Sequence, residues 1–139
     1  TFDRNDYVTQ RVNEVARKIK WDEEDIFFIN QGSGEVTVIV DKKNSHMLND
    51  CNKYKIELTD NLTIVSVKEI LQSGVEKSIN APGIYAYFIN RLARRSINIV
   101  AVISTYTQIT FAFKAADFIK AYETLDECIN YFRGKIRGD

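Results

Sequence analysis

The stretch that decides the fold runs from Asn80 to Ser104 and reads NAPGIYAYFINRLARRSINIVAVIS. Pro82 fixes its own φ angle, and Gly83 accepts backbone conformations that other residues avoid, so this pair predicts a tight turn. The residues after the turn predict a helix over 84–95, because apolar side chains recur there at the spacing of one helical face. Those side chains belong to Ile84, Phe88 and Leu92.

A strand is predicted over 97–105, immediately after this helix. Its apolar residues fall on both faces, and the set expected to point one way is Ile97, Ile99, Ala101 and Ile103. Because strands with two apolar faces are usually buried on both sides, we expect this strand at the centre of its sheet. Its hairpin partner follows, with alternating apolar side chains at Ile109, Phe111 and Phe113.

The remainder of the second half predicts one further strand and one further helix. Residues 62–70 form an apolar run typical of a strand, and a polar loop follows over 72–80. A final helix is predicted from about 116 to 132, where aromatic and aliphatic residues recur at helical spacing. The second half therefore reads strand, helix, strand, strand, helix.

The first half repeats part of this order at a separation of about 75 residues. Its predicted elements are a helix over 6–20, a hairpin over 26–40, a weak helix over 42–52 and a strand over 54–58. The hairpin turn contains Gly32 and Gly34, which we expect to supply positive φ angles. The shared order of helix, hairpin and helix indicates an internal repeat of pattern rather than of sequence identity.

The second half resembles the ACT domain, a βαββαβ module that binds amino acids in many biosynthetic enzymes. The resemblance covers about 62–132 and rests on the order and spacing of short motifs. These motifs are Asn80-Ala81-Pro82-Gly83-Ile84-Tyr85, Leu92-Ala93-Arg94-Arg95-Ser96-Ile97-Asn98-Ile99 and Ile103-Ser104-Thr105. The Ser-Thr ending of the strand is similar to the aspartokinase version of the domain.

The resemblance implies an α+β chain of ferredoxin-like βαββαβ ACT units in tandem, with antiparallel sheets and helices on one face. We expect a degenerate ACT-like unit over 1–60, whose first strand is missing or lies in 1–5, and an ACT domain over 61–139. The second unit has little chain left for a last strand after Phe132. The whole is similar to the paired regulatory units of aspartokinases, without a kinase domain.

The junction before the helix of 84–95 is the candidate ligand site. Glycine lets a ligand approach the backbone closely, and a helix start presents unpaired N–H groups and partial positive charge that suit a carboxylate. Asn80 adds an amide that both donates and accepts hydrogen bonds. The candidate residues for binding an amino acid are Asn80, Ala81, Gly83, Ile84, Tyr85 and, from the second strand, Asn98. The alternative is structural: Asn80 only caps a helix, and Gly83 only relieves backbone strain.

Charge and composition argue against several other classes of function. The 139 residues contain 19 basic and 19 acidic side chains, so no strong field favours nucleic acid or a membrane surface as a partner. No apolar run reaches the ~20 residues that span a bilayer, and the polar start is unlike a signal peptide, so we expect the cytoplasm. Cys51 and Cys128 are isolated and expected as buried reduced thiols. With a single histidine, we expect no metal and no cofactor.

No catalytic set is predicted. His46 lies among polar residues and is expected at the surface, and no Gly-x-Ser-x-Gly nucleophile elbow occurs. The acidic run at 22–25 is expected to be a solvated loop. The cations that end the helix of 84–95 complement its dipole, although they could also hold a ligand carboxylate. They are Arg91, Arg94 and Arg95.

We therefore expect a non-enzymatic, allosteric regulatory protein that senses an amino acid at an interface between ACT units. Its partners would be the amino acid, further copies of itself in a homodimer or tetramer, and an amino-acid biosynthetic enzyme. The alternative is a ligand-free ACT module that oligomerises or acts on a partner enzyme. A third interpretation, an effector domain in transcription, is disfavoured because no helix-turn-helix pattern precedes the βαββα units.

Overall fold

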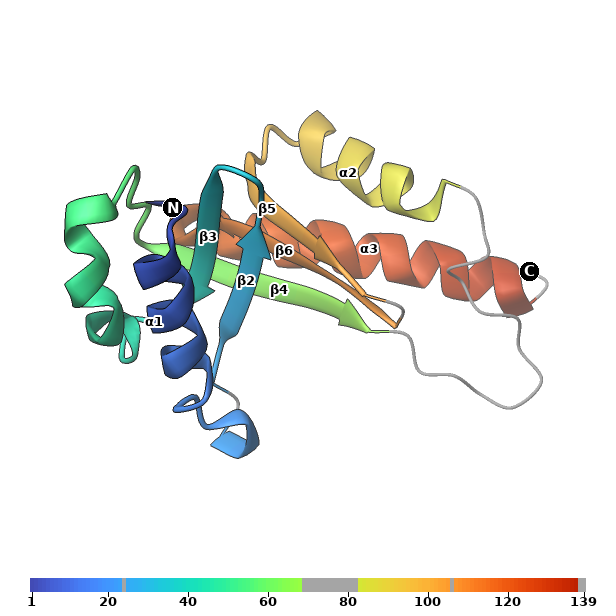
Figure 1. Cartoon of the computed structure of the whole chain (residues 1–139). Coiled ribbons are helices and arrows are strands. Elements are labelled where there is room, and N and C mark those ends of the chain that lie inside the picture. The colour runs from blue at the N-terminus through green and yellow to red at the C-terminus, as the bar shows by residue number, and fades with distance from the viewer. Residues whose placement is uncertain (24, 69–82, 106, 138–139) are drawn as a thin grey trace. The chain divides into compact units, whose positions relative to one another are not determined.

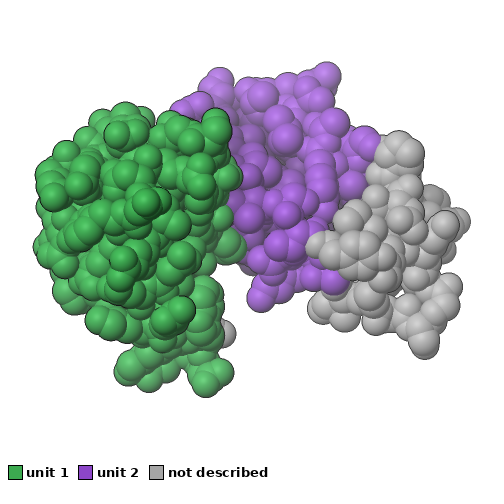
Figure 2. Space-filling view, viewed as in Figure 1, with its two compact units in different colours: residues 1–59 green, residues 60–139 purple. Residues whose placement is uncertain are grey.

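The computed structural model describes residues 1–23, 25–68, 83–105 and 107–137. The chain divides into two compact units, Thr1–Thr59 and Asp60–Asp139, which Figure 2 shows in different colours. Within the described residues, each unit contains a three-stranded antiparallel sheet with helices packed against one face (Figure 1). The α+β class with antiparallel sheets is therefore confirmed.

The second unit follows the predicted order of strand, helix, strand, strand and helix. Its elements are β4 Leu62–Lys68, α2 Ile84–Arg94, β5 Ile99–Ser104, β6 Gln108–Lys114, the short 3-10 helix η4 Ala115–Asp117, and α3 Phe118–Arg137. The loop predicted over 72–80 lies outside the described residues. Because α3 continues to Arg137, the described part of this unit has three strands and does not include the last strand of a complete βαββαβ unit.

The strand order β4-β6-β5 places β6 at the centre of the sheet. The prediction of a central strand over 97–105 is therefore wrong, since β5 pairs with β6 alone among the described strands. Side-chain burial explains the difference. All residues from Ile109 to Phe113 in β6 are buried, whereas Val100 and Val102 of β5 are 37% and 44% exposed. Val100 and Val102 are thus exposed because β5 lies at the edge of the described sheet.

A β-bulge near the start of β5 changes which side of the sheet its residues face. Ile99 pairs with Phe113, but Ala101 pairs with Ala112, so the register shifts between them. Residues that pair across an antiparallel sheet share a face, which places Ile99 on the side of Phe113 and Ala101 on the opposite side. The prediction that Ile99 and Ala101 point the same way is therefore wrong.

The core of the second unit lies between its sheet and the helices α2 and α3. The buried residues of this core are Phe88, Leu92, Ile97, Ile109, Phe111, Phe113, Ala121, Leu125 and Cys128. The predicted inner face of α2 is confirmed, because Phe88 and Leu92 are buried and Ile84 packs against the same core. Burying a large apolar side chain contributes ~1.5–3 kcal/mol, so this layer holds both helices on the sheet.

In the first unit, the strand that comes third in the sequence lies at the centre of the sheet, between the first and the second strands. Its elements are β1 Phe2–Asp3, α1 Asp6–Ala16, the 3-10 helix η1 Trp21–Glu23, β2 Phe27–Gln31, β3 Glu35–Val40 and the 3-10 helix η2 Ser45–Tyr54. The sheet order is β1-β3-β2. The core between this sheet and the helices α1 and η2 consists of Phe2, Val8, Val12, Val15, Ile19, Phe27, Val36, Leu48 and Cys51.

The strand predicted over 54–58 does not form a ladder. Phe2 and Lys55 make one isolated bridge, and the N–H groups of Ile56 and Glu57 both donate to the carbonyl of Thr1, at 2.9 and 3.2 Å. Because two donors share one acceptor, the alternating register of a strand pair is lost here. This segment is an irregular edge beside β1.

The two helices of the first unit are shorter or tighter than predicted. The helix α1 ends at Ala16, and the N–H of Lys18 bonds to the carbonyl of Val15 at 2.8 Å, a 3-10 contact that closes the last turn. The weak helix of 42–52 is the 3-10 helix η2, which has no side-chain cap at Asn44. Its Ser, Asn and Asp residues compete with the backbone for hydrogen bonds, as Ser45 does by bonding to the carbonyl of Lys42.

The hairpin between β2 and β3 forms as predicted, but its glycines behave differently. Neither Gly32 nor Gly34 has a positive φ angle. The turn closes instead through the N–H of Gly32, which donates to the carbonyl of Glu35 at 2.9 Å.

Candidate functional site

The helix α2 begins at Gly83, in agreement with the sequence. Gly83 is the N-cap residue, and its φ of 83° lies in the left-handed region that glycine accepts without strain. A Cβ atom at this position would meet no described atom within 4 Å. The first turn of α2 has no acidic residue, and its N-cap makes no side-chain hydrogen bond. Neither the N-cap nor the first turn of α2 therefore supplies a carboxylate of its own.

The helix α1 begins differently, although it also has 11 residues. Its N-cap is Asn5, whose side-chain Oδ1 accepts a hydrogen bond from the N–H of Val8 at 3.0 Å. Asp6 adds a carboxylate in the first turn. One unpaired N–H group and the positive helix end are thus met by the protein's own side chains.

The predicted ligand-site residues are only partly brought together. Asn80–Ala81 lie outside the described residues. Ile84–Tyr85 directly follow Gly83, are half-buried and pack against the core of the second unit. Asn98 is exposed between α2 and β5, beyond the far end of an 11-residue helix that is ~16 Å long. Within one chain, Asn98 therefore lies at the opposite end of α2 from Gly83.

The arginines near the end of α2 bind a neighbouring helix. Arg95 donates to both carboxylate oxygens of Glu127 at 2.8 Å, and Arg91 reaches the same carboxylate at 3.2 Å. Glu127 belongs to α3, so these contacts tie the two helices together. The acceptor for Arg91 and Arg95 is thus a carboxylate of the protein itself, while Arg94 stays exposed in the last turn.

The first unit contains an arrangement of the same kind. Arg11 of α1 binds Asp50 of η2 at 3.0 Å, and Asp50 directly precedes the buried Cys51. In the second unit, the acidic partner of Arg91 directly precedes the buried Cys128. Burial raises the pKa of both thiols, so these cysteines are held as neutral, enclosed groups.

A pocket of about 390 Å³ lies in the first unit, between the segment after α1 and the loop from β3 to η2. Its positively charged lining residues are Lys18, Lys20 and Lys43. The other lining residues are Glu23, Asp25, Asn44, His46 and Met47. Sequence reasoning missed this pocket because the lining comes from two separate segments that meet only when the β2–β3 hairpin forms.

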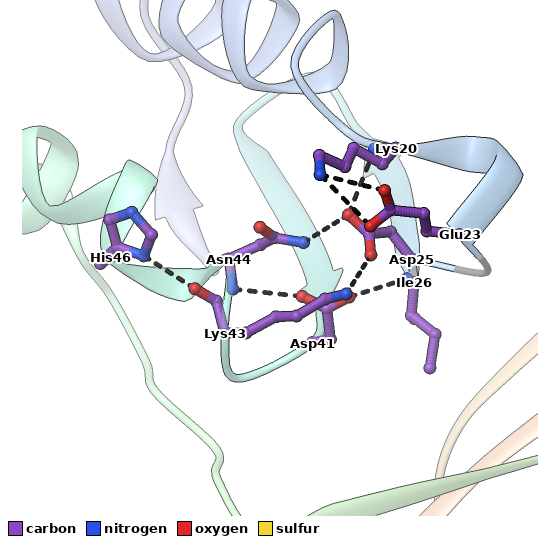
Figure 3. Close-up of polar contacts among 8 residues, drawn as sticks. All are labelled: Lys20, Glu23, Asp25, Ile26, Asp41, Lys43, Asn44 and His46. Carbon is purple, nitrogen blue, oxygen red and sulfur yellow. Dashed lines mark hydrogen bonds and ion pairs between the residues drawn. The ribbon is translucent and has the colours of Figure 1, made fainter.

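Asp25 is the buried centre of this cluster (Figure 3). Its side chain is 3% exposed, and its carboxylate accepts hydrogen bonds from the backbone N–H of Lys20 at 3.2 Å and from Asn44 at 2.8 Å. The ammonium of Lys43 pairs with the same carboxylate. The Lys43 contact is the main cause that lowers the pKa of Asp25, and it outweighs the desolvation that would raise it. The prediction that the whole run of 22–25 is solvated is therefore wrong for Asp25.

Asp41 holds the other side of the same loop. Its Oδ2 accepts from the N–H of Ile26 at 3.0 Å, and its Oδ1 accepts from the N–H of Asn44 at 3.2 Å (Figure 3). The N–H of Asp41 also donates to the carbonyl of Ile26 at 3.2 Å. The hydrogen bonds of Asp25 and Asp41 together hold the start of β2 against the loop after β3.

The described residues include no group of three or more His, Cys, Asp or Glu side chains that could hold a metal ion. His46 is exposed, as predicted, and its Nδ1 lies 2.8 Å from the carbonyl oxygen of Lys43. None of the helices in the described part of the chain has the length and apolar character needed to cross a membrane.

Comparisons with known proteins identify the architecture. No protein-family model and no curated protein matches the chain. The ligand-free regulatory subunit of aspartate kinase from Thermus thermophilus matches with a TM-score of 0.66 and 13% identity, over 91% of this chain and 87% of that one. Aspartokinase alpha and beta subunits match with a TM-score of 0.65 and 15% identity, over 93% and 87%. The fold is ACT-like.

A third solved structure shows how much of a whole enzyme this fold represents. Aspartate kinase from Clostridium acetobutylicum matches with a TM-score of 0.68 and 14% identity, over 91% of this chain. This chain spans 31% of that protein's length. The sequence resembles the ACT domain only in its second half. The similarity in fold covers most of the chain.

Proposed function

We propose that this chain is a non-catalytic regulatory protein that binds an amino acid at the start of α2. The ACT-like fold, which regulatory subunits of aspartate kinase also have, supports the regulatory part of the proposal. The observation that carries the binding part is the contrast between two helix starts. Asn5 and Asp6 occupy the start of α1, whereas Gly83 puts no side chain at the start of α2.

The proposed chemistry is that of a zwitterion at a helix end. The carboxylate of the amino acid would accept hydrogen bonds from first-turn N–H groups, at the positive end of the helix dipole. Gly83 would act through its backbone, because any side chain there would occupy the space that the ligand needs. Asn80 would contact a polar end of the ligand, since its amide both donates and accepts. The remaining proposed contacts are Ala81, Ile84 and Tyr85.

We further propose that the protein is a homodimer or tetramer. In its own chain, Asn98 lies at the opposite end of α2 from Gly83, so it would enter the proposed site only from a second copy. Binding would then favour assembly, because the complete site exists only between copies. An amino-acid biosynthetic enzyme is the proposed target of the regulation.

A thermal-shift screen against the twenty standard amino acids tests the binding proposal. A ligand present at 100 times its dissociation constant stabilises the folded state by about 2.7 kcal/mol. For a domain of this size, that raises the unfolding midpoint by several degrees. We expect at least one amino acid to produce this rise, and the absence of any rise contradicts the proposed sensor.

Two glycine substitutions locate the binding site. Gly83→Ala and Gly34→Ala are matched, because a Cβ at either position would meet nothing within 4 Å. Gly83→Ala alone also costs about 1–2 kcal/mol, because alanine resists the left-handed region, so each variant is compared with its own ligand-free midpoint. We expect the ligand-induced rise to disappear in Gly83→Ala and to persist in Gly34→Ala. Equal ligand-induced rises of the unfolding midpoint in both variants would show that the amino acid binds elsewhere than at the start of α2.

A second candidate function is that of a ligand-free interaction module, and the edge strand β5 favours it. Val100 and Val102 are exposed on this strand, and an edge strand offers N–H and C=O groups to a strand of another chain. Sedimentation of the wild type and of Val102→Lys tests this function. If the substitution dissociates an oligomer while no amino acid raises the unfolding midpoint, the interaction module replaces the sensor.

A further inference from the structure

We infer that the pocket of the first unit binds a small anion that carries a carboxylate or a phosphate group. This site is separate from the amino-acid site proposed above, because its lining residues all lie between Lys18 and Met47, in the first unit. The start of α2 belongs to the second unit. The two sites therefore share no residue, and either can be wrong without the other.

The walls of the pocket are fixed before any ligand arrives. Asp25 is buried and joins the backbone of Lys20 to the side chains of Lys43 and Asn44. Asp41 holds the backbone of Asn44 from the other side. A site whose donors are already positioned loses less conformational entropy on binding, so this frame favours affinity for a small ligand.

The lining holds three lysines and two carboxylates. Lys20 pairs with Glu23 and Lys43 pairs with Asp25, but Lys18 makes no ion pair with any described residue. Lys18 lies close enough to Glu14 to lower the pKa of that carboxyl, but without an ion pair its ammonium can also attract a negatively charged ligand.

The paired lysines also remain accessible to a ligand. The side chain of Lys20 is 65% exposed and that of its partner Glu23 is 59% exposed, and such an exposed pair contributes little to stability. An anion can therefore share the ammonium of Lys20 at little cost. The ring of His46 uses Nδ1 for the carbonyl of Lys43, which leaves Nε2 for a further contact.

The pocket has the size of a site for a small molecule. About 390 Å³ lies at the lower end of the range of ~300–1,000 Å³ that ligand sites occupy. Met47 supplies an apolar wall beside the charged groups. The pocket thus suits a compact anion with one charged group and a short carbon skeleton, or phosphate itself.

An NMR titration of the full chain tests this site. Amide shifts are followed while inorganic phosphate or, separately, acetate is added, with the ionic strength held constant by sodium chloride. We expect saturating shifts at Lys18, Lys20, Asn44 and His46 with at least one probe, and the tighter probe identifies phosphate or carboxylate as the preferred group. Shifts that never saturate, or that sodium chloride alone reproduces, overturn the inference.

Two charge-matched variants separate a specific site from general charge attraction. Lys18→Gln removes the lining lysine that makes no ion pair with a described residue, and Lys120→Gln removes an exposed cation on α3 in the second unit. Because a hydrogen bond to a charged group contributes ~1.5–3 kcal/mol, we expect Lys18→Gln to weaken binding about tenfold or more. We expect Lys120→Gln to leave it unchanged. Equal weakening in both variants, or none in Lys18→Gln, contradicts the site.

Discussion

The side-chain amide of Asn44 donates to the carboxylate of Asp25 across 2.8 Å, although the two residues lie 19 positions apart in the sequence. Together with the backbone of Lys20 and the ammonium of Lys43, this contact surrounds a buried carboxylate with donors. The β2–β3 hairpin brings the partners together, because the N–H of Asp41 bonds to the carbonyl of Ile26 at its open end. A buried charge of this kind makes the stability of the first unit depend on pH.

The first prediction concerns acid unfolding and Asp25→Asn. The pKa of Asp25 is lower in the folded state than its ordinary value of about 3.9, so the unfolded state binds more protons near that pH. The contribution of Asp25 to stability is complete above the unfolded pKa and is lost as the pH falls through the folded pKa. We expect urea melts of the wild type to show a steeper loss of unfolding free energy below about pH 4 than those of Asp25→Asn. Identical slopes contradict the buried ion pair.

The second prediction concerns the cap of α1. Asn5→Ala removes the acceptor that the N–H of Val8 uses, and such a loss typically costs ~1 kcal/mol of unfolding free energy. Asn5→Ser is the matched control, because a serine hydroxyl can accept the same hydrogen bond. Urea unfolding at neutral pH should place Asn5→Ser near the wild type and Asn5→Ala clearly below it. If the two variants unfold alike, the cap does not hold the helix.

The third prediction tests the strand order of the second sheet. Phe111 is fully buried on the central strand β6, so Phe111→Ala should cost ~3–5 kcal/mol. Val102 is largely exposed on the edge strand β5, so Val102→Ala should change the unfolding free energy by only about 0.5 kcal/mol. Chemical denaturation of both variants gives the comparison. A large cost for Val102→Ala would instead support a central β5.

The error over β5 shows what a single sequence does not encode. The helix from Ile84 to Arg94 was predictable because its apolar spacing and its glycine start are local signals. The position of β5 was not, because a strand with apolar residues on both faces can lie at the centre of a sheet or at an edge. The bulge between Ile99 and Ala101 likewise depends on the pairing with β6, and no residue type in the strand predicts it.

The candidate sites divide in the same way. Gly83 was recognisable, since a glycine before a helical pattern has a local conformational reason. The role of Asp25 was not predictable, because this residue belongs to a run of acidic residues, and such runs usually form solvent-exposed loops. Its burial depends on Asn44 and Lys43, which the hairpin brings close only in the folded chain.

The fourth prediction concerns the two thiols. Cys51 and Cys128 are fully buried, and burial raises their pKa, so little thiolate forms and reagents cannot reach it. We expect reaction with a thiol-specific chromogenic disulfide at neutral pH to be slow in the native protein and fast in urea. Rapid modification of either cysteine without denaturant contradicts its place in the core.

Isothermal titration calorimetry measures whether one amino acid binds at the start of α2 in each chain. The titrant is whichever amino acid raises the unfolding midpoint most, added to the wild type and to Gly83→Ala and Gly34→Ala. We expect one site per chain in the wild type and in Gly34→Ala, because Asn5 and Asp6 already occupy the start of α1, and no binding in Gly83→Ala. Two equivalent sites per chain, or unchanged binding in Gly83→Ala, would contradict it.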